Sequence, residues 1–158
     1  MAWTDSRVFR PYLADVLGNV TAITLPGDTV RAALYGTTPT PDNDVTSALS
    51  AYNAATSQWV TANEVFQAGQ WAQAGVALTS TVLNSATADT IFYDAADTAS
   101  GSAATLSAVF GCLVYDDTIA TPVADQGLSY NYFGGTNSVT NGTFTVVWNA
   151  NGIFRLTL

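Results

Sequence analysis

Histidine and lysine are absent from this sequence of 158 residues, and cysteine and glutamate occur once each. Without histidine the chain has neither the commonest general base nor the commonest metal ligand, so most catalytic constellations are unavailable. Its four arginines are the only basic side chains, and they are too few to neutralise a run of phosphates. We therefore expect no enzymatic activity, no nucleic-acid partner and no membrane partner.

Charge of either sign is scarce, and long apolar runs are missing. Charged residues make up 10% of the chain, against about 25% in ordinary soluble domains, and the formal net charge is -8. A surface of small polar and apolar side chains suits permanent contact with other subunits. No window approaches the 18 or so apolar residues that a membrane span requires. The start lacks the features of a signal peptide, so we expect synthesis in a cytoplasm with Cys112 as a buried thiol.

The N-terminal segment, residues 1–26, is predicted to differ from the remainder. Apolar residues between Thr4 and Gly18 recur at helical spacing, with the helix either starting near Pro11 or kinked there. The segment is interpreted either as a lid on its own core or as an arm docked on a neighbour. Residues 27–158 are predicted to form a single β-sandwich domain.

Short β-branched or aromatic runs separated by turn residues predict strands in that domain. The expected strands are 29–35, 59–66, 76–83, 90–93, 106–115, 128–133, 143–148 and 153–158. A helix of two or three turns, capped by Asp42 or Asp44, is expected after the first strand. The last three strands are predicted to form a meander, with Asn151-Gly152 as its tight turn. Alternation puts Phe144, Val146 and Trp148 on one face of the second strand and Phe154, Leu156 and Leu158 on one face of the third, both toward the core. The predicted class is mainly β, an antiparallel β-sandwich with one or two short helices.

Candidate chemical sites are few. Aspartates gather at 42–44, 94–97 and 116–117, but their spacing favours caps and loops over a bound cation. Gly134-Gly135 lacks the lysine of a phosphate loop and is interpreted as a turn. We predict no catalytic, cofactor-binding or metal-binding residue, and no cofactor.

Beyond Thr29 the chain carries a series of short sequence words. They are ALY at 33–35, TPDND at 40–44, AY at 51–52, WVTANEV at 59–65, GVAL at 75–78, FYDAAD at 92–97, GCLVYDD at 111–117, YFGG at 132–135 and GTFTVVW at 142–148. Together they resemble a family of small virion proteins of tailed bacteriophages, described as head decoration or minor tail proteins. The resemblance implies a structural role, and it carries over no functional residue because none of the words is a catalytic motif.

Three functions follow as expectations. The first is a capsid decoration protein on the virion surface, made in the host cytoplasm, that reinforces the coat lattice through the major capsid protein and copies of itself as a homo-oligomer. The second is a minor tail or baseplate component. The third, from another class, is a carbohydrate-binding β-sandwich that stacks sugars on exposed tryptophans such as Trp71.

The attachment surface is predicted from composition in two places. One is the N-terminal segment, with Phe9, Tyr12 and Leu13. The other is the loop containing Pro39, Thr40 and Pro41.

Overall fold

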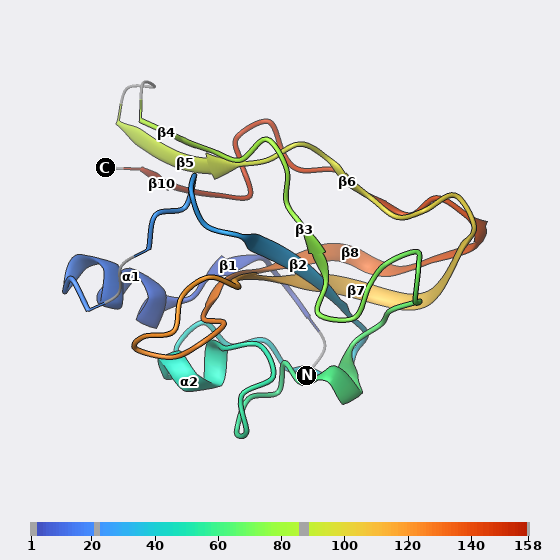
Figure 1. The fold of residues 1–158 in the computed structure, drawn as a ribbon, viewed down its shortest axis with the longest axis horizontal. Coiled ribbons are helices and arrows are strands. Elements are labelled where there is room, and N and C mark those ends of the chain that lie inside the picture. Colours follow the sequence, from blue (N-terminus) through green and yellow to red (C-terminus); the bar gives the residue numbers. More distant parts are fainter. Residues whose placement is uncertain (1–2, 21–22, 86–88, 158) are drawn as a thin grey trace.

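The computed structural model describes residues 3–20, 23–85 and 89–157. Most of its regular structure is β-strand, accompanied by short helices (Figure 1). In chain order the elements are β1 (Arg7–Val8), α1 (Arg10–Leu17), β2 (Val30–Tyr35), α2 (Ser47–Ser50), the 3-10 helix η1 (Thr61–Asn63), β3 (Val76–Ala77), β4 (Val82–Asn84), β5 (Thr90–Asp94), β6 (Thr98–Ala99), β7 (Ala104–Asp116), β8 (Gly127–Gly142), β9 (Thr145–Val146) and β10 (Phe154–Thr157).

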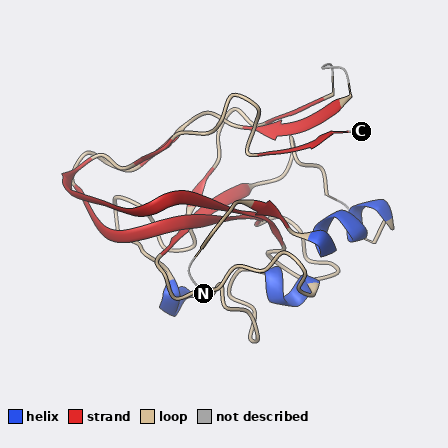
Figure 2. Ribbon diagram, turned by 180° about the vertical axis from the view of Figure 1, so that it is seen from behind, coloured by secondary structure: helices blue, strands red, loops and turns tan. Residues whose placement is uncertain are grey.

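A five-stranded antiparallel sheet occupies the centre of the molecule, in the order β1-β8-β7-β2-β3 (Figure 1). Its longest strands, β7 and β8, form a two-stranded ribbon that crosses the whole structure (Figure 2). β2 pairs along its full length with the second half of β7. Apart from Arg31, β2 is continuously apolar and buried, the pattern of a strand covered on both faces.

The ribbon folds back over the central sheet at its far end (Figures 1 and 2). Its ladder continues from Ala104 opposite Gly142 to Ala99 opposite Thr145, where β6 and β9 form a two-stranded sheet. A three-stranded sheet in the order β10-β5-β4 lies in the same layer. These two small sheets and the central sheet make the two layers of a β-sandwich.

The other face of the central sheet is covered by residues 36–75, which include α2 and η1 (Figure 1). This segment places the fully buried Trp59 among rings from the sheet and the N-terminal segment. Its ring centroid lies 5.1 Å from that of Tyr35, 5.6 Å from Trp3, 6.1 Å from Phe9 and 6.3 Å from Tyr130. We call these five residues the aromatic cluster. Edge-to-face and stacked rings of this kind stabilise a core beyond their buried area.

The predicted fold class is confirmed: the protein is mainly β, with antiparallel sheets and two short α-helices. The predicted strands at 29–35, 90–93 and 106–115 correspond to β2, β5 and β7. The pairing of β7 with β8 shifts register between Val109 and Gly111. α1 starts at Arg10 with Pro11 in its first turn, so the first of the two helix alternatives is correct.

The strand predicted at 59–66 is wrong. The segment forms η1 and loops, touching the sheet by one isolated bridge between Glu64 and Tyr35. Trp59 turns inward to fill the aromatic cluster, which interrupts the alternation that a strand would need. The run predicted at 76–83 divides into β3 and β4, because Ser80 takes a positive φ of 53° and the chain passes to another sheet.

The predicted C-terminal meander is also wrong. β8, β9 and β10 pair with β7, β6 and β5 in three different sheets. The turn at Asn151-Gly152 exists, with the Gly152 N–H donating to the Asn149 carbonyl at 2.7 Å, but the strands beside it do not pair with each other. Alternation identified the faces of these strands correctly, since Phe144, Val146 and Trp148 are all buried. Leu158 lies outside the described residues.

Two smaller predictions need correction. α2 has one turn instead of two or three, and its cap is Thr46, whose hydroxyl accepts from the Leu49 N–H, instead of Asp42 or Asp44. Gly134 and Gly135 lie inside β8 with φ of 78° and 154°, where a turn was predicted. Glycine permits this irregularity within a strand that continues on both sides.

Candidate functional site

An apolar groove of about 630 Å³ lies between α1 and the three-stranded sheet, and residues 23–26 form its third wall. We call it the apolar groove. Among the described lining residues, only Tyr12, Thr24 and Thr157 have polar side chains, and none is charged. The lining residues are Tyr12, Leu13, Val16, Leu17, Ile23, Thr24, Leu25, Pro26, Leu83, Ile91, Phe154, Leu156 and Thr157.

Large aliphatic side chains stand in solvent at this groove. Leu17, the last residue of α1, is 87% exposed, Leu83 of β4 is 45% exposed, and Val16 is 41% exposed. Single exposed apolar residues are ordinary on protein surfaces, but a contiguous set around a concave apolar floor marks an interaction site.

The structure divides the residues predicted for attachment. Tyr12 and Leu13 line the apolar groove, where Tyr12 is 4% exposed and packs against Phe154 at a centroid distance of 6.0 Å. Phe9 is fully buried in the aromatic cluster and is not accessible to a partner.

The predicted loop residues lie elsewhere, under the central sheet. Pro39 is buried, Pro41 is half-buried and Thr40 is exposed. The Thr40 carbonyl accepts from the Gln58 side chain at 2.7 Å, which ties this loop to its own domain. None of the three lines the apolar groove.

One wall of the groove ends at a pair of carboxyl groups. Asp28 accepts from the Thr24 N–H at 2.6 Å, closing the turn that follows the wall, and its carboxyl group lies within hydrogen-bonding range of Asp116 at the end of β7. The pKa of Asp116 is raised to about 6: burial is the largest cause and the negative charge of Asp28 acts in the same direction, while the N–H groups of Thr118 and Ile119 oppose the rise. Asp116 therefore keeps its proton to a higher pH than an ordinary aspartate does.

A second buried carboxyl group, Glu64, is 8% exposed under the central sheet. It accepts hydrogen bonds from the Tyr52 hydroxyl at 2.9 Å, the Gly75 N–H at 3.1 Å and the Ala74 N–H at 3.2 Å. Burial raises the pKa of Glu64, while these three donors lower it. Tyr52 also stacks on Tyr115 at 4.7 Å. Glu64 thus joins residues 36–75 to the sheet as a structural tie.

The remaining candidates serve the fold. Cys112 is fully buried, and burial raises the pKa of its thiol well above the usual range, so it is inert. All four tryptophans, Trp3, Trp59, Trp71 and Trp148, are at most 9% exposed, which leaves no tryptophan platform for sugars.

The grouped aspartates have structural partners. Asp44 pairs with Arg10 at 2.6 Å, Asp117 pairs with Arg31 at 2.6 Å, and Asp97 accepts from the Trp148 N–H at 3.0 Å. Within the described ranges, no three His, Cys, Asp or Glu side chains are grouped to hold a metal ion. No helix in those ranges has the length and apolarity to cross a membrane.

No family model, curated protein or solved structure matches the chain. In the described structure, the apolar groove combines a concave apolar lining with large aliphatic side chains that are exposed to solvent.

Proposed function

We propose that this protein is a structural subunit of a bacteriophage virion, a head decoration protein that binds the assembled coat through the apolar groove. The observation that carries the proposal is the groove itself, an open apolar surface on a chain whose aromatic cluster is closed. The sequence resemblance to small virion proteins supports a location in the virion.

The lining favours a protein partner over a small polar ligand. Specific small-molecule sites combine an apolar wall with a few placed polar groups, and among the described lining residues the only polar side chains are those of two threonines and Tyr12. Apolar side chains from a coat subunit need no such groups. Burying a leucine fully contributes about 1.5–3 kcal/mol, so Leu17 and Leu83 together supply enough free energy to anchor a contact.

Electrostatics fit the same role. The net charge of -8 helps to keep the free protein soluble before assembly, and it supports a position on the outer surface of the head, away from packaged DNA. The partner we propose is the major capsid protein. Each contact made across neighbouring coat subunits adds interface that internal pressure must also break.

The number of copies per virion tests whether the protein decorates the head. Purified virions are analysed by quantitative mass spectrometry against the major capsid protein. A ratio near one to one, or one copy per threefold cluster, supports decoration. A handful of copies supports the minor tail or baseplate alternative, and absence from particles overturns both.

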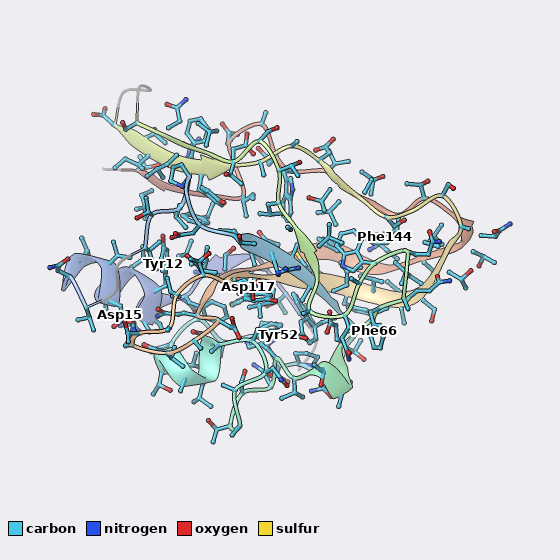
Figure 3. The ribbon with its side chains drawn as sticks, in the orientation of Figure 1. Tyr12, Asp15, Tyr52, Phe66, Asp117 and Phe144 are labelled. Carbon is cyan, nitrogen blue, oxygen red and sulfur yellow. The ribbon has the colours of Figure 1, made fainter. Side chains whose placement is uncertain are left out.

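Two matched variants test the surface. Leu17→Asp places a charge at the groove, and Phe66→Asp places the same charge on a side chain that is 43% exposed near the opposite end of the molecule (Figure 3). We expect Leu17→Asp to weaken binding to heads that lack the protein by about a hundredfold, because the burial of one anchor is lost and a charge is desolvated. Phe66→Asp retains binding. Equal binding by both variants contradicts the proposal.

A further inference from the structure

The ribbon of β7 and β8 has two outer edges, and residues 67–70 cover the edge on the β7 side. There the Gln67 side chain accepts from the Thr105 N–H, and the Gln70 side chain accepts from the Ala103 N–H at 3.3 Å. Side-chain amides thus occupy backbone groups that a further strand would otherwise bind. The β7 edge is closed to added strands.

The outer edge of β8 has much less cover. β1 pairs with it only at Ser129 and Tyr130, and the Tyr132 N–H donates to the Ser6 hydroxyl at 2.9 Å. Beyond Tyr132, no strand of the described ranges pairs with this edge. Alternate N–H and C=O groups of an antiparallel edge strand face outward, so the edge offers donors and acceptors to another chain.

Natural sheets protect such edges with lysine, proline, other charges or bulges. Gly134 and Gly135, with their positive φ, make one end of this edge irregular. The following residues, Thr136 to Thr140, are continuous strand without charge or proline. This five-residue stretch is the exposed part that can accept a strand.

The distribution of charged residues indicates that the strand added at this edge comes from a second copy of the chain. No charged residue occurs between Gln126 and Phe154 or between Thr98 and Tyr115, so eleven of the twelve acidic side chains of the protein lie outside the ribbon and the turn beyond it. The exception, Asp116, is buried at the end of β7 that is farthest from that turn. Copies of a chain with a net charge of -8 repel each other where their aspartates meet. The ribbon is the surface on which two copies can meet without facing like charges.

We infer that Thr136–Thr140 of β8 pairs antiparallel with the same strand of a second copy, joining two central sheets across a twofold axis. When a strand pairs antiparallel with its own copy, every backbone hydrogen bond across the axis occurs twice, as a twofold interface requires. With Ser138 on the axis, Thr136 lies opposite Thr140 of the partner subunit. Threonine pairs in this position stabilise neighbouring strands.

The surface beside the edge favours this pairing. A groove of about 380 Å³ runs next to β8, lined in part by Tyr132, Phe133 and Val147. Val147 is 71% exposed, the most exposed large apolar side chain of the described residues after Leu17. Side chains on one face of an added strand enter this groove and cover Val147.

The test uses the isolated full chain, without particles, so that it is independent of coat binding. Sedimentation velocity measures self-association, and hydrogen exchange measures backbone protection. We expect a dimer whose Thr136–Thr140 amides gain protection as concentration rises. The double variant T136K/T140K puts lysines opposite each other and should raise the dimer dissociation constant at least about tenfold, less at high salt.

The control is T56K/T79K, which makes the same change in charge at two exposed threonines in other loops. It should leave the dimer intact. A chain that stays monomeric up to about 1 mM overturns the inference. So does a dimer that survives T136K/T140K, or one that Leu17→Asp breaks instead, since the apolar groove would then be the interface between copies.

Discussion

The protein contains two apolar regions that are covered to very different degrees. In the aromatic cluster, residues 36–75 close over the sheet, and the rings of Tyr35 and Trp59 are fully buried. At the apolar groove, an open space separates part of α1 from the three-stranded sheet, and Leu17 and Leu83 remain partly or largely exposed to solvent. The first region holds the chain together, while the second retains surface that only another molecule can bury.

The comparison separates residues that act in folding from residues that act in contact. Each apolar residue of the cluster already has its neighbours, so its loss leaves a cavity. The exposed leucines have few neighbours to lose, so their loss affects binding alone. Variants in the two regions should therefore give opposite patterns of stability and binding.

The largest effect is expected in the cluster, for Trp59→Ala. Removing a fully buried ring that contacts four others should lower the free energy of unfolding by about 3–5 kcal/mol. Urea titration followed by circular dichroism measures the change. Trp59→Phe is the control, because it keeps a ring and removes an indole N–H that has no hydrogen-bond partner among the described residues. A Trp59→Ala variant as stable as Trp59→Phe would mean that the cluster does not hold the fold.

The next effect is expected at Glu64, which ties the covering segment to the sheet. Glu64→Ala removes the acceptor of the Tyr52 hydroxyl and the Ala74 N–H, leaves the Gly75 N–H with the Ala72 carbonyl alone, and should cost about 2–3 kcal/mol. Glu64→Gln keeps one acceptor oxygen and should cost less. Thermal unfolding of both variants measures the difference, and equal losses would show that the hydrogen bonds contribute little.

A pH-dependent effect is expected at Asp116, where the central sheet meets the groove wall. Its folded pKa of about 6 lies above the ordinary value of 3.8, so the folded chain binds the proton more tightly than the unfolded chain. The resulting stability is fully present below 3.8 and is lost as pH rises through 6. Wild-type unfolding free energy should fall by roughly 1–3 kcal/mol over this interval, measured by urea titration at several pH values.

Asp116→Asn removes this dependence, because the amide does not titrate. Asp28→Asn should reduce it, since the neighbouring negative charge disappears while burial remains. A wild-type profile that is flat between pH 4 and 7 would mean that the pKa of Asp116 is not raised in the folded protein.

The sequence predicted which side chains of a strand point to the core, but it did not predict which strands pair with each other. Alternation placed Phe144, Val146 and Trp148 inside, because side-chain direction depends only on the strand itself. It also indicated an apolar face for Phe154 and Leu156, but it could not show that this face lines an open groove, since that depends on where α1 docks.

The alternation of apolar and polar residues does not show which strands pair. β10 pairs with β5, about sixty residues earlier in the chain, and the sequence of a local turn does not specify pairing between strands so far apart. Of the three N-terminal residues predicted for attachment, Tyr12 and Leu13 line the groove, whereas Phe9 is buried. Composition alone does not distinguish an apolar residue that faces the core from one that faces a partner.

The smallest effect on stability is expected for Leu17→Ala, and it gives the sharpest contrast with the closed core. Leu17 is 87% exposed at the end of α1, so its truncation should change the free energy of unfolding by less than about 0.5 kcal/mol. Leu34→Ala makes the same chemical change at a fully buried position and should cost about 2–5 kcal/mol. Head binding should show the reverse order once each variant is folded, because Leu17 contributes burial only in the complex. If Leu17→Ala lowers stability as much as Leu34→Ala, then the groove already belongs to the folded core and is not a surface held open for the coat.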